Sequence, residues 1–465
     1  MGKKLKVVIC SSEVVPFAKT GGLADVAGSL PQALEKQGLE VIVIMPKYKN
    51  IDYPENLAKI GKNISVYFIE NDGFFKRDGL YGDSLGDYED NLDRFIYYSQ
   101  EAIRLLKKIN FKPQIIHCND WQTALIPVYL KSIYTRDKFF KNCKTVFTIH
   151  NLGYQGLFPK EQFKKIGLGN DFFTLETLEF YGKVNVLKGG LVFSDVLTTV
   201  SENYAKEIQT PEYGCGLDGV LLYRKKVLHG IINGINYEEW NPATDKVIAK
   251  NYDPRNLEDK YINKEDLQKI SGLEKRSNLP LIGLITRLAD QKGLDILTRA
   301  IDEICQLPVQ FILLGTGEDK YHVFFKQIAK KYPKNVSINL KFDAALAYKI
   351  YAGCDMFLMP SRYEPCGLGQ LISLKYATVP LVRNTGGLAD TVVDFMPYQD
   401  EGNGFVFSEY SSGTLLEMVK RAVTVYYHRS VWKKLVKRTV EDDFSWEQSA
   451  RKYVELYEET IKLPS

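Results

Sequence analysis

A glycine-containing hexapeptide, TGGLAD, occurs twice in the chain, at residues 20–25 and again at 385–390. Each copy stands between an apolar run and a helical pattern. Paired glycines there let a ligand approach the backbone, and the start of the helix offers unpaired N–H groups. Lys19 precedes the first copy and adds a charge suited to phosphate, whereas Asn384 precedes the second. The repeat indicates two sites for anionic or hydroxyl-rich groups; the alternative is a packing solution shared by two strand–helix turns.

Two cations, Arg287 and Lys292, flank another strand–helix turn in the segment 286–293. Cations near a helix start favour diphosphate binding, because guanidinium and ammonium groups add to the helix N–H groups and dipole. If a nucleoside diphosphate leaves during a reaction, these groups stabilise its developing charge. The alternative is a pair of surface cations. It is less favoured because both follow a strand end, where open α/β sheets bind ligands.

Glu364 is the carboxylate of the segment PSRYEPCGLGQL, residues 360–371, which follows the apolar run 356–359. Pro365 blocks continuation of a helix, and Gly367 opens the next helix at close backbone distance. A carboxylate held there can accept hydrogen bonds from sugar hydroxyls; the alternative is a carboxylate that caps the following helix.

Polar and aromatic residues end two apolar runs in the first half of the chain, in the segments HCNDW (117–121) and TIHN (148–151). Such residues suit a carbohydrate pocket, where hydroxyls are hydrogen-bonded and a sugar face stacks on a ring. We interpret His117 as structural. His150, followed by Asn151 and Gly153, is expected to face a cleft.

These segments belong to two series in which apolar runs alternate with helical patterns. Continuous Val, Ile and Leu runs predict strands buried on both faces of a parallel sheet covered by helices. The expected strands span 5–11, 39–45, 114–117, 145–149, 196–200 and 227–232 in the first series, with a helix over 23–37, and 279–285, 309–314, 336–342, 356–359 and 379–383 in the second. The predicted fold class is α/β, with two doubly wound, Rossmann-like lobes facing across a cleft.

The expected domains are an N-terminal lobe over residues 1–240, an interlobe connection over 241–278, a C-terminal lobe over 279–445 and a closing helix over 446–465. The connection is rich in Lys, Glu and Asp and has no strand pattern. The tail is amphipathic, so it is able to pack back on the first lobe.

The composition argues against several classes of protein. Hydrophobic residues make up 45% and charged residues 25% of the 465, and the net charge of +4 comes from 61 basic and 57 acidic residues spread along the chain. No basic run forms a stripe that follows nucleic-acid phosphates, so no nucleic-acid partner is expected. The seven cysteines include no C-x-x-C pair and the five histidines have no metal-ligand spacing. Reduced cysteines and no metal are therefore expected.

The first residues, MGKKLKVVICSS, are basic and then apolar. The apolar run is only about six residues long and Glu13 follows soon after, so a buried strand fits better than a signal peptide. No stretch approaches the roughly 20 apolar residues of a membrane span. A cytoplasmic protein with no membrane partner is expected.

Taken together and in order, the segments resemble bacterial glycogen synthase and plant starch synthase, a family of retaining glucosyltransferases with the two-lobed GT-B fold. The matching segments are KTGGLADV, HCNDW, TIHNLGYQG, TVSENYAKEI, INGINYEEWNP, TRLADQKG, LLGTGE, PSRYEPCGLGQL, NTGGLADTV and FSW. Eight or more ordered motifs over nearly the whole chain are far more specific than any single glycine turn.

The resemblance implies transfer of glucose from ADP-glucose to the non-reducing end of an α-1,4-glucan such as glycogen or a maltooligosaccharide, without a cofactor. It implies catalytic roles for Asp120, His150, Arg287, Lys292 and Glu364. Arg287 and Lys292 match the family's diphosphate-binding pair, and Glu364 matches a glutamate near the donor sugar and ribose. The substrate-binding positions that it implies are Lys19, Gly22, Asp25, Asn151, Asn233, Cys366, Gly367, Leu368, Gly369 and Thr385.

Two positions depart from the pattern that the family leads us to expect. Gly369 stands where threonine is expected, and Ile372 stands where related retaining enzymes often have a second glutamate. No carboxylate is therefore a convincing nucleophile for a double displacement. The resemblance favours same-face substitution, with the departing phosphate helping to deprotonate the acceptor and Arg287 and Lys292 serving in place of a metal.

Other classes of protein remain as alternatives. A dehydrogenase needs G-x-G-x-x-G after a strand, and the nearest segment, 315–318, lacks the third glycine. A phosphorylase should have a cofactor-binding lysine in a context that is not found. Another retaining GT-B enzyme using UDP-glucose, or a non-catalytic glucan-binding homologue, stays open.

Overall fold

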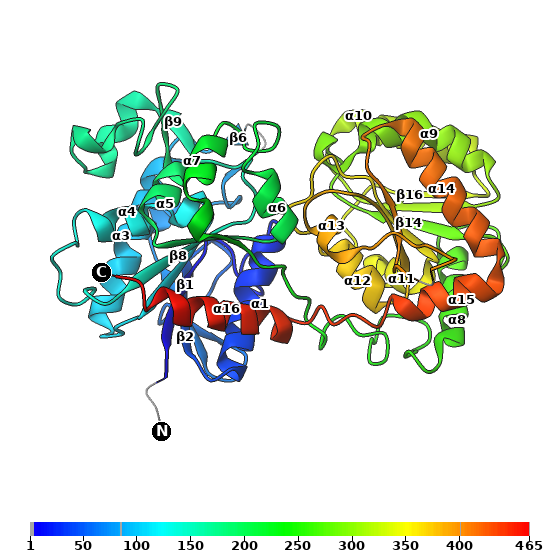
Figure 1. Cartoon of the computed structure of the whole chain (residues 1–465), viewed down its shortest axis with the longest axis horizontal. Coiled ribbons are helices and arrows are strands. Elements are labelled where there is room, and N and C mark those ends of the chain that lie inside the picture. The colour runs from blue at the N-terminus through cyan, green and yellow to red at the C-terminus, as the bar shows by residue number, and fades with distance from the viewer. Residues whose placement is uncertain (1–3, 84–85, 400, 465) are drawn as a thin grey trace. The chain divides into compact units, whose positions relative to one another are not determined.

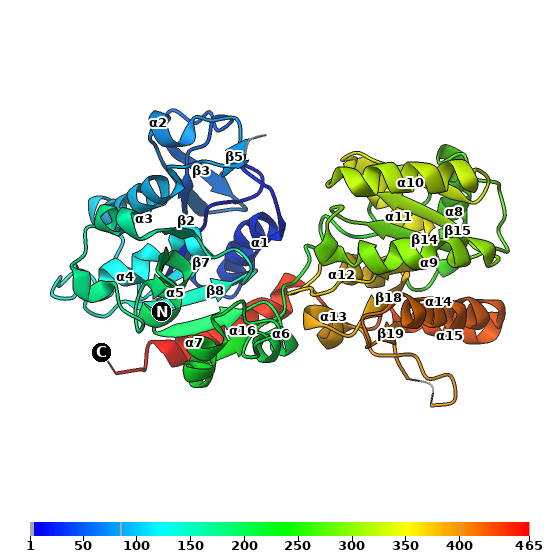
Figure 2. The same cartoon turned by 90° about the horizontal axis from the view of Figure 1, so that it is seen from above.

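The computed structural model describes residues 4–83, 86–399 and 401–464, and these form two compact units. The first unit is Met1–Gly234 together with Trp446–Ser465, and the second is Ile235–Ser445. Each unit is built on a sheet with helices on both faces (Figures 1 and 2). The chain therefore passes from the first unit to the second after Gly234 and returns to the first at Trp446.

The first unit contains an eight-stranded sheet of order β13-β12-β8-β7-β1-β2-β4-β3, parallel except for β3, which is antiparallel to β4. Its strands are β1 (Lys6–Cys10), β2 (Glu40–Pro46), β3 (Leu57–Ile60), β4 (Ile64–Ile69), β7 (Ile115–Asn119), β8 (Lys144–Ile149), β12 (Val196–Thr199) and β13 (Leu228–Gly230). After β1 the chain builds one side of the sheet, and from β7 it builds the other. The switch point at β1 and β7 is where open α/β sheets bind ligands.

Apolar side chains fill the space between this sheet and its helices. Val7, Val8 and Ile9 of β1 are all buried, as their continuous apolar run predicted. The helices of this unit are α1 (Gly22–Lys36), α2 (Asp72–Phe75), α3 (Asn91–Lys108), α4 (Leu125–Lys131), α5 (Val186–Phe193), α6 (Glu202–Glu207), α7 (Asp218–Tyr223) and α16 (Trp446–Thr460). Two small antiparallel sheets add β5 (Gly82–Asp83) with β6 (Gly86–Asp87), and β9 (Leu157–Pro159) with β11 (Lys183–Asn185) and β10 (Glu179–Phe180).

Helix α16 packs on the first unit beside α1 (Figure 1). Trp446, Tyr453 and Tyr457 of α16 are buried in the first unit's core. The Tyr457 hydroxyl is hydrogen-bonded to Nδ1 of His117 at 2.7 Å. Burial lowers the pKa of His117 to about 3, and the ring is a structural member of the core, as interpreted from the sequence.

The second unit contains a six-stranded parallel sheet of order β16-β15-β14-β17-β18-β19. Its strands are β14 (Leu281–Ile285), β15 (Gln310–Leu314), β16 (Val336–Asn339), β17 (Met356–Met359), β18 (Val379–Arg383) and β19 (Phe405–Phe407). Its helices are α8 (Lys260–Ile270), α9 (Leu294–Gln306), α10 (Asp319–Lys331), α11 (Ala344–Gly353), α12 (Gly369–Lys375), α13 (Gly386–Thr391), α14 (Ser412–Tyr427) and α15 (Arg429–Arg438). The switch point lies at β14 and β17, and two Rossmann-like folds are thus confirmed.

The segment 241–278, expected as a connection between lobes, is instead part of the second unit, which begins at Ile235. Its polar composition predicted an exposed connection, but two of its lysines, Lys260 and Lys264, are buried. The Lys260 ammonium group donates to three backbone carbonyls, that of Ala352 at 2.8 Å among them, and to the Thr378 hydroxyl at 2.7 Å. Lys264 forms a buried ion pair with Asp355 at 2.6 Å. These contacts fasten α8 to the sheet.

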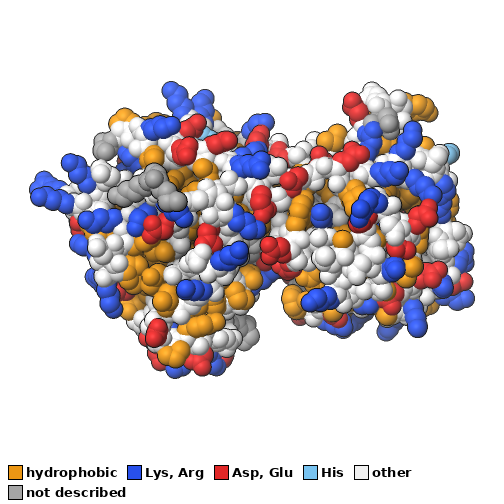
Figure 3. Space-filling view, turned by 90° about the horizontal axis from the view of Figure 1, so that it is seen from below, with side chains coloured by type: hydrophobic (Ala, Val, Ile, Leu, Met, Phe, Trp, Pro, Cys, Tyr) orange, Lys and Arg blue, Asp and Glu red, His pale blue; other side chains and the backbone are white. Residues whose placement is uncertain are grey.

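Lys and Arg side chains alternate with Asp and Glu over the faces of both units that Figure 3 draws, in keeping with the dispersed charge of the sequence. Among the described residues, no helix is both long and apolar enough to cross a membrane. The cytoplasmic location expected from the sequence stays a prediction.

Candidate functional site

The loop between β1 and α1 is held by a buried carboxylate that the sequence analysis did not single out. Glu13 Oε2 accepts from the backbone N–H groups of Thr20 at 2.5 Å and Gly21 at 3.2 Å. Its Oε1 accepts from the Thr20 hydroxyl at 2.6 Å and from the Tyr81 hydroxyl at 2.7 Å. The turn therefore takes its shape from one side chain, which is 3% exposed.

The glycines of this first TGGLAD copy are open to solvent. Gly21 and Gly22 are exposed, and a Cβ placed on Gly21 would meet no atom within 4 Å. Lys19 and Asp25, both expected to bind substrate, pair with one another at 2.7 Å on the exposed side of the turn. A ligand can thus reach the backbone here, but an anion has to compete with Asp25 for the Lys19 ammonium group.

Asp120 and His150 lie together at the carboxyl ends of β7 and β8. Asp120 Oδ1 accepts from the His150 backbone N–H at 2.8 Å, and His150 Nε2 is hydrogen-bonded to Asn119 Oδ1 at 2.8 Å. Asp120 has φ of +56° and ψ of 179°, a backbone conformation that residues other than glycine rarely adopt. Such backbone strain costs about 1–3 kcal/mol and clusters at functional sites.

Burial sets the charge states of both side chains. It raises the pKa of the Asp120 carboxyl to about 7, against hydrogen bonds from the backbone N–H groups of His150 and Asn151, which favour the carboxylate. It lowers the pKa of His150 to about 3, so the ring is neutral at physiological pH. This pair can therefore hydrogen-bond a neutral ligand without presenting a full positive charge.

The other two expected substrate contacts of the first unit lie near chain turns. Asn151 is partly buried, and its Oδ1 accepts from the Gly153 backbone N–H at 3.0 Å. Asn233 is 5% exposed and adjoins Gly234, the last residue of this stretch of the first unit. Its Oδ1 has no hydrogen-bond partner among the described residues, so it retains an acceptor for a ligand.

The second unit has a cavity of about 170 Å³ at the carboxyl ends of β14 and β17. Six of the expected site residues line it, namely Arg287, Lys292, Glu364, Gly367, Leu368 and Gly369. The neighbouring Ser361, which was not expected, lines it as well. Lys292 Nζ pairs with Glu364 Oε2 at 2.6 Å, and the Ser361 hydroxyl donates to the same oxygen at 2.9 Å. Glu364 is buried and Lys292 is partly exposed, so the ammonium group of Lys292 is accessible from the cavity while the carboxylate holds it in place.

Gly293 allows the two loops of this cavity to approach each other. It has φ of +71°, and a Cβ there would overlap the carbonyl oxygen of Pro360. Glycine at this position thus brings Lys292 next to Glu364. Arg287 enters the same cavity from the end of β14, and its Nη2 donates to Gln291 Oε1 at 3.3 Å.

Gly369 departs from the family pattern for a reason that the structure shows. A Cβ on Gly369 would lie 2.9 Å from the ring of Phe357 and 3.3 Å from the sulfur of Met359. In this chain the two large side chains of β17 occupy the space that a threonine side chain requires. In place of a threonine hydroxyl, the first N–H groups of α12, which begins at Gly369, can donate to a phosphate that Arg287 and Lys292 also contact.

The second TGGLAD copy is packed rather than open. Thr385, Gly386 and Gly387 are buried, and the Gly387 N–H donates to the carbonyl oxygens of Glu364 and Pro365, both at 3.1 Å. A Cβ on Gly386 would overlap the Glu364 carbonyl oxygen, and one on Gly387 would overlap the carbonyl oxygen of Cys366. Thr385 and Cys366 therefore lie next to the cavity wall, in support of the loop that holds Glu364.

Sequence comparison assigns both units to known families. Residues 6–223 match the family described as "Starch synthase catalytic domain", and residues 265–439 match "Glycosyl transferases group 1". The glycogen synthase of Geotalea daltonii is 49% identical over 475 residues, which cover 97% of this chain and 98% of that protein. The glycogen synthase of Pseudothermotoga lettingae is 48% identical over 489 residues, with 98% and 99% covered. The chain belongs to the glycogen and starch synthase family.

Structural comparison agrees with this assignment. The catalytic domain of starch synthase IV from Arabidopsis thaliana, solved with ADP and acarbose bound, matches with a TM-score of 0.90 at 34% identity, over 99% of this chain and 100% of that one. The resemblance stated from the motifs is confirmed, and so is the prediction of a glycosyltransferase of the glycogen and starch synthase type with two Rossmann-like lobes.

The family motifs directed attention to charged and glycine residues, and this bias explains what was missed. Glu13, Asn119 and Ser361 position Thr20, His150 and Glu364 respectively. Asn119 and Ser361 lie inside the motifs HCNDW and PSRYEPCGLGQL, but their residue types did not single them out. Glu13 was visible only as the residue that ends an apolar run. An acid between an apolar run and a glycine turn is the signal that could have found it, because a carboxylate so close to a buried strand needs hydrogen-bond donors.

No group of three or more His, Cys, Asp and Glu side chains arranged to hold a metal ion occurs within residues 4–83, 86–399 and 401–464. The second-unit cavity presents Arg287 and Lys292 instead, and these cations suit a diphosphate. Catalysis without a metal or cofactor stays a prediction.

Proposed function

We propose that this glycogen and starch synthase family member transfers glucose from ADP-glucose to the non-reducing end of an α-1,4-glucan, with retention of the anomeric configuration. One observation supports this above the rest: Lys292 and Glu364 are paired at 2.6 Å in a cavity that Arg287 also lines, at the switch point of the second sheet. Two cations and a buried carboxylate meet the needs of a diphosphate and of sugar hydroxyls respectively.

The second unit would bind the donor. Arg287 and Lys292 would neutralise the diphosphate, whose charge grows as the bond to glucose breaks. Glu364 holds Lys292 in place before the donor arrives and would then accept hydrogen bonds from donor hydroxyls. The N–H groups at the start of α12 would complete the donor site, and Thr385 and Cys366 would support the loop that holds Glu364.

The first unit would contribute contacts to the transferred glucose and to the acceptor. His150 has an uncharged ring, and Asp120 holds the His150 backbone through its hydrogen bond. Lys19, Gly22 and Asp25 would form a loop that contacts the donor, and Asn151 and Asn233 would add amide groups. This assignment of roles follows the resemblance residue by residue.

The proposal is tested by incubating the chain with ADP-glucose and glycogen and measuring released ADP together with glucan elongation. We expect both products to form in equal amounts, with slower reaction from UDP-glucose. ADP release without elongation, or no release from either donor, would contradict the proposal. A faster reaction with UDP-glucose would show that the donor base is uracil and not adenine, and glucose transfer itself would remain supported.

The donor role of Lys292 makes a sharper prediction. Lys292→Ala should lower turnover at least about tenfold, because one preorganised contact to developing charge is lost. Since this change also leaves the buried Glu364 carboxylate without its partner, Lys292→Gln, which keeps a hydrogen-bond donor, should fold normally and still lose turnover. Lys331→Ala removes an exposed lysine of α10 that pairs with Asp302, and it should have normal turnover. Near-normal turnover in both Lys292 variants would exclude the donor role.

A further inference from the structure

A second and larger cavity, of about 320 Å³, lies at the amino ends of the strands β17 and β18 in the second unit. Asp355, which precedes β17, and Ala377, which precedes β18, both line it. The donor cavity lies beyond the other end of β17, after Met359. The family motifs contribute no residue to the larger cavity, and the proposed transfer reaction makes no use of it.

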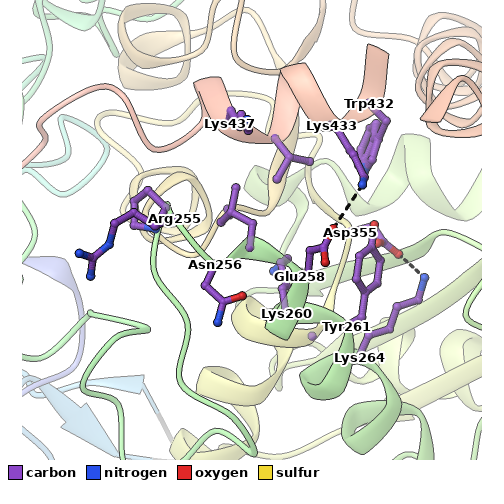
Figure 4. Close-up of a pocket in the computed structure, with 15 residues that line it drawn as sticks. Arg255, Asn256, Glu258, Lys260, Tyr261, Lys264, Asp355, Trp432, Lys433 and Lys437 are labelled. Atoms are coloured by element: carbon purple, nitrogen blue, oxygen red, sulfur yellow. Dashed lines mark hydrogen bonds and ion pairs between the residues drawn. The ribbon is translucent and has the colours of Figure 1, made fainter. Parts of the chain in front are cut away.

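Two elements form the walls of this cavity. Helix α15 forms one wall, and the turn Pro254–Leu257 with the first turns of α8 forms the other (Figure 4). Leu257, Tyr261 and Val436 give it an apolar lining, and Tyr261 is 36% exposed. The volume lies within the range of about 300–1,000 Å³ that is usual for small-molecule sites.

Cations outnumber acids along the lining. Lys260 and Lys264 are buried and held by carbonyl groups and by Asp355, so they fasten the wall rather than face a ligand. Lys433 pairs with Glu258 at 3.4 Å, with side chains 63% and 81% exposed, as the dashed line in Figure 4 marks. An exposed pair at this distance is weak, so an anion can replace the Glu258 carboxylate.

Lys437 supplies positive charge that no acid compensates. It is exposed, and no described residue forms an ion pair with it. Lys433 and Lys437 are four residues apart on α15, so both ammonium groups project from the same helix face into the cavity. Like charges at this spacing repel one another, and an anion bound between them removes that repulsion.

We propose that this cavity binds a phosphorylated small molecule, with the phosphate between Lys433 and Lys437 and a ring against Tyr261, Leu257 and Val436. Ammonium groups suit phosphate oxygens, and an apolar lining suits a sugar face or a base. Inorganic phosphate, a sugar phosphate and a nucleoside monophosphate share this chemistry, and their affinities distinguish them.

The test is calorimetric titration of the full chain with inorganic phosphate, glucose 6-phosphate and AMP, each separately. We expect saturable binding of at least one probe, and the probe with the lowest Kd identifies the source. Lys433→Gln and Lys437→Gln should each raise that Kd at least about fivefold, and Glu258→Gln should lower it about twofold, because a competing carboxylate is removed. Lys434→Gln is the matched control, since Lys434 is an exposed lysine of the same helix that does not line the cavity.

The Lys292→Gln variant distinguishes probe binding in the donor cavity from probe binding in the larger cavity. If the probe binds in the larger cavity, its Kd should be unchanged in this variant. A Kd that rises in Lys292→Gln but not in Lys437→Gln would overturn the proposal. So would the absence of saturable binding for all three probes, or equal effects of Lys434→Gln and Lys437→Gln. Because none of these measurements follows glucose transfer, failure here would leave the proposed function untouched.

Discussion

The two TGGLAD copies have the same sequence but are held in different ways. In the first, one carboxylate, Glu13, accepts four hydrogen bonds from the loop and from Tyr81, and Gly21 faces open space. In the second, Gly386 and Gly387 are buried against the backbone of residues 364–366. The glycines serve ligand access in one copy and close backbone packing in the other.

The comparison teaches that an internal repeat does not imply two equivalent binding sites. Backbone packing leaves the second copy little freedom and little accessible surface, whereas a side chain holds the first copy in place and leaves its N–H groups near solvent. The second copy therefore supports the loop that holds Glu364, and we expect the first to contact the substrate directly.

Alanine substitution of the glycines tests this difference most strongly. Gly387→Ala should destabilise the second unit by about 3 kcal/mol or more, because its Cβ would overlap the backbone of Cys366, which cannot move as a flexible side chain does. Gly21→Ala should change stability by less than about 0.5 kcal/mol, since its Cβ meets no atom. Urea unfolding of the two variants measures both values. Equal destabilisation would show that the two copies are held alike.

Removal of the carboxylate tests the first copy alone. Glu13→Ala should lower turnover with ADP-glucose about tenfold to a hundredfold, because the loop loses its hydrogen-bond acceptor and with it the position of its N–H groups. Glu13→Gln keeps one acceptor oxygen and should recover part of the loss, which a merely structural defect would not predict. Glu89→Ala, a change at an exposed acid of the same unit, serves as the control. Full turnover in Glu13→Ala would mean that the loop has no part in the reaction.

A dependence of stability on pH is expected in the first unit, because its site contains the buried Asp120 carboxyl. The Asp120 pKa is about 7 in the folded chain and about 3.9 in an unfolded one. Between these values the folded state binds more protons, so the Asp120 contribution to stability falls as pH rises from about 4 to about 7 and is constant above. Asp120→Asn should remove this penalty, which amounts to up to about 4 kcal/mol.

Thermal unfolding at a series of pH values measures the effect. The difference in Tm between Asp120→Asn and the original chain should grow from pH 4 to pH 7 and then level off. His150 titrates in both proteins with its pKa lowered to about 3, so its opposite contribution cancels in the difference. A difference in Tm that does not change with pH would contradict the burial of an Asp120 carboxyl with a raised pKa.

Much of the fold could be predicted from the sequence, because its strands are buried on both faces. Runs such as Val7–Ile9 and Leu281–Ile285 leave little choice between a parallel strand and any other element. The segment 241–278 was predicted wrongly, because pattern analysis assigns lysine to the surface. Lys260 can be buried because carbonyl groups of α11 and of Tyr376, directly after α12, accept its hydrogen bonds.

The site was predictable where residue type alone implies chemistry, as for Arg287 and Lys292. It was not predictable where a residue acts through another. Glu13 and Thr20 are seven residues apart, and only the folded turn brings the carboxylate under the loop. The openness of one glycine pair and the burial of the other also depend on neighbours distant in sequence, such as Cys366 beside Gly387.

The position of α16 has a consequence for how the protein is made. The core of the first unit is completed by Trp446, Tyr453 and Tyr457, which the ribosome synthesises after the entire second unit. The second unit is therefore synthesised completely before the first unit is, although the first unit begins earlier in the chain. Nascent chains that lack α16 therefore expose the apolar surface that this helix covers, including the neighbourhood of His117, until α16 has been synthesised.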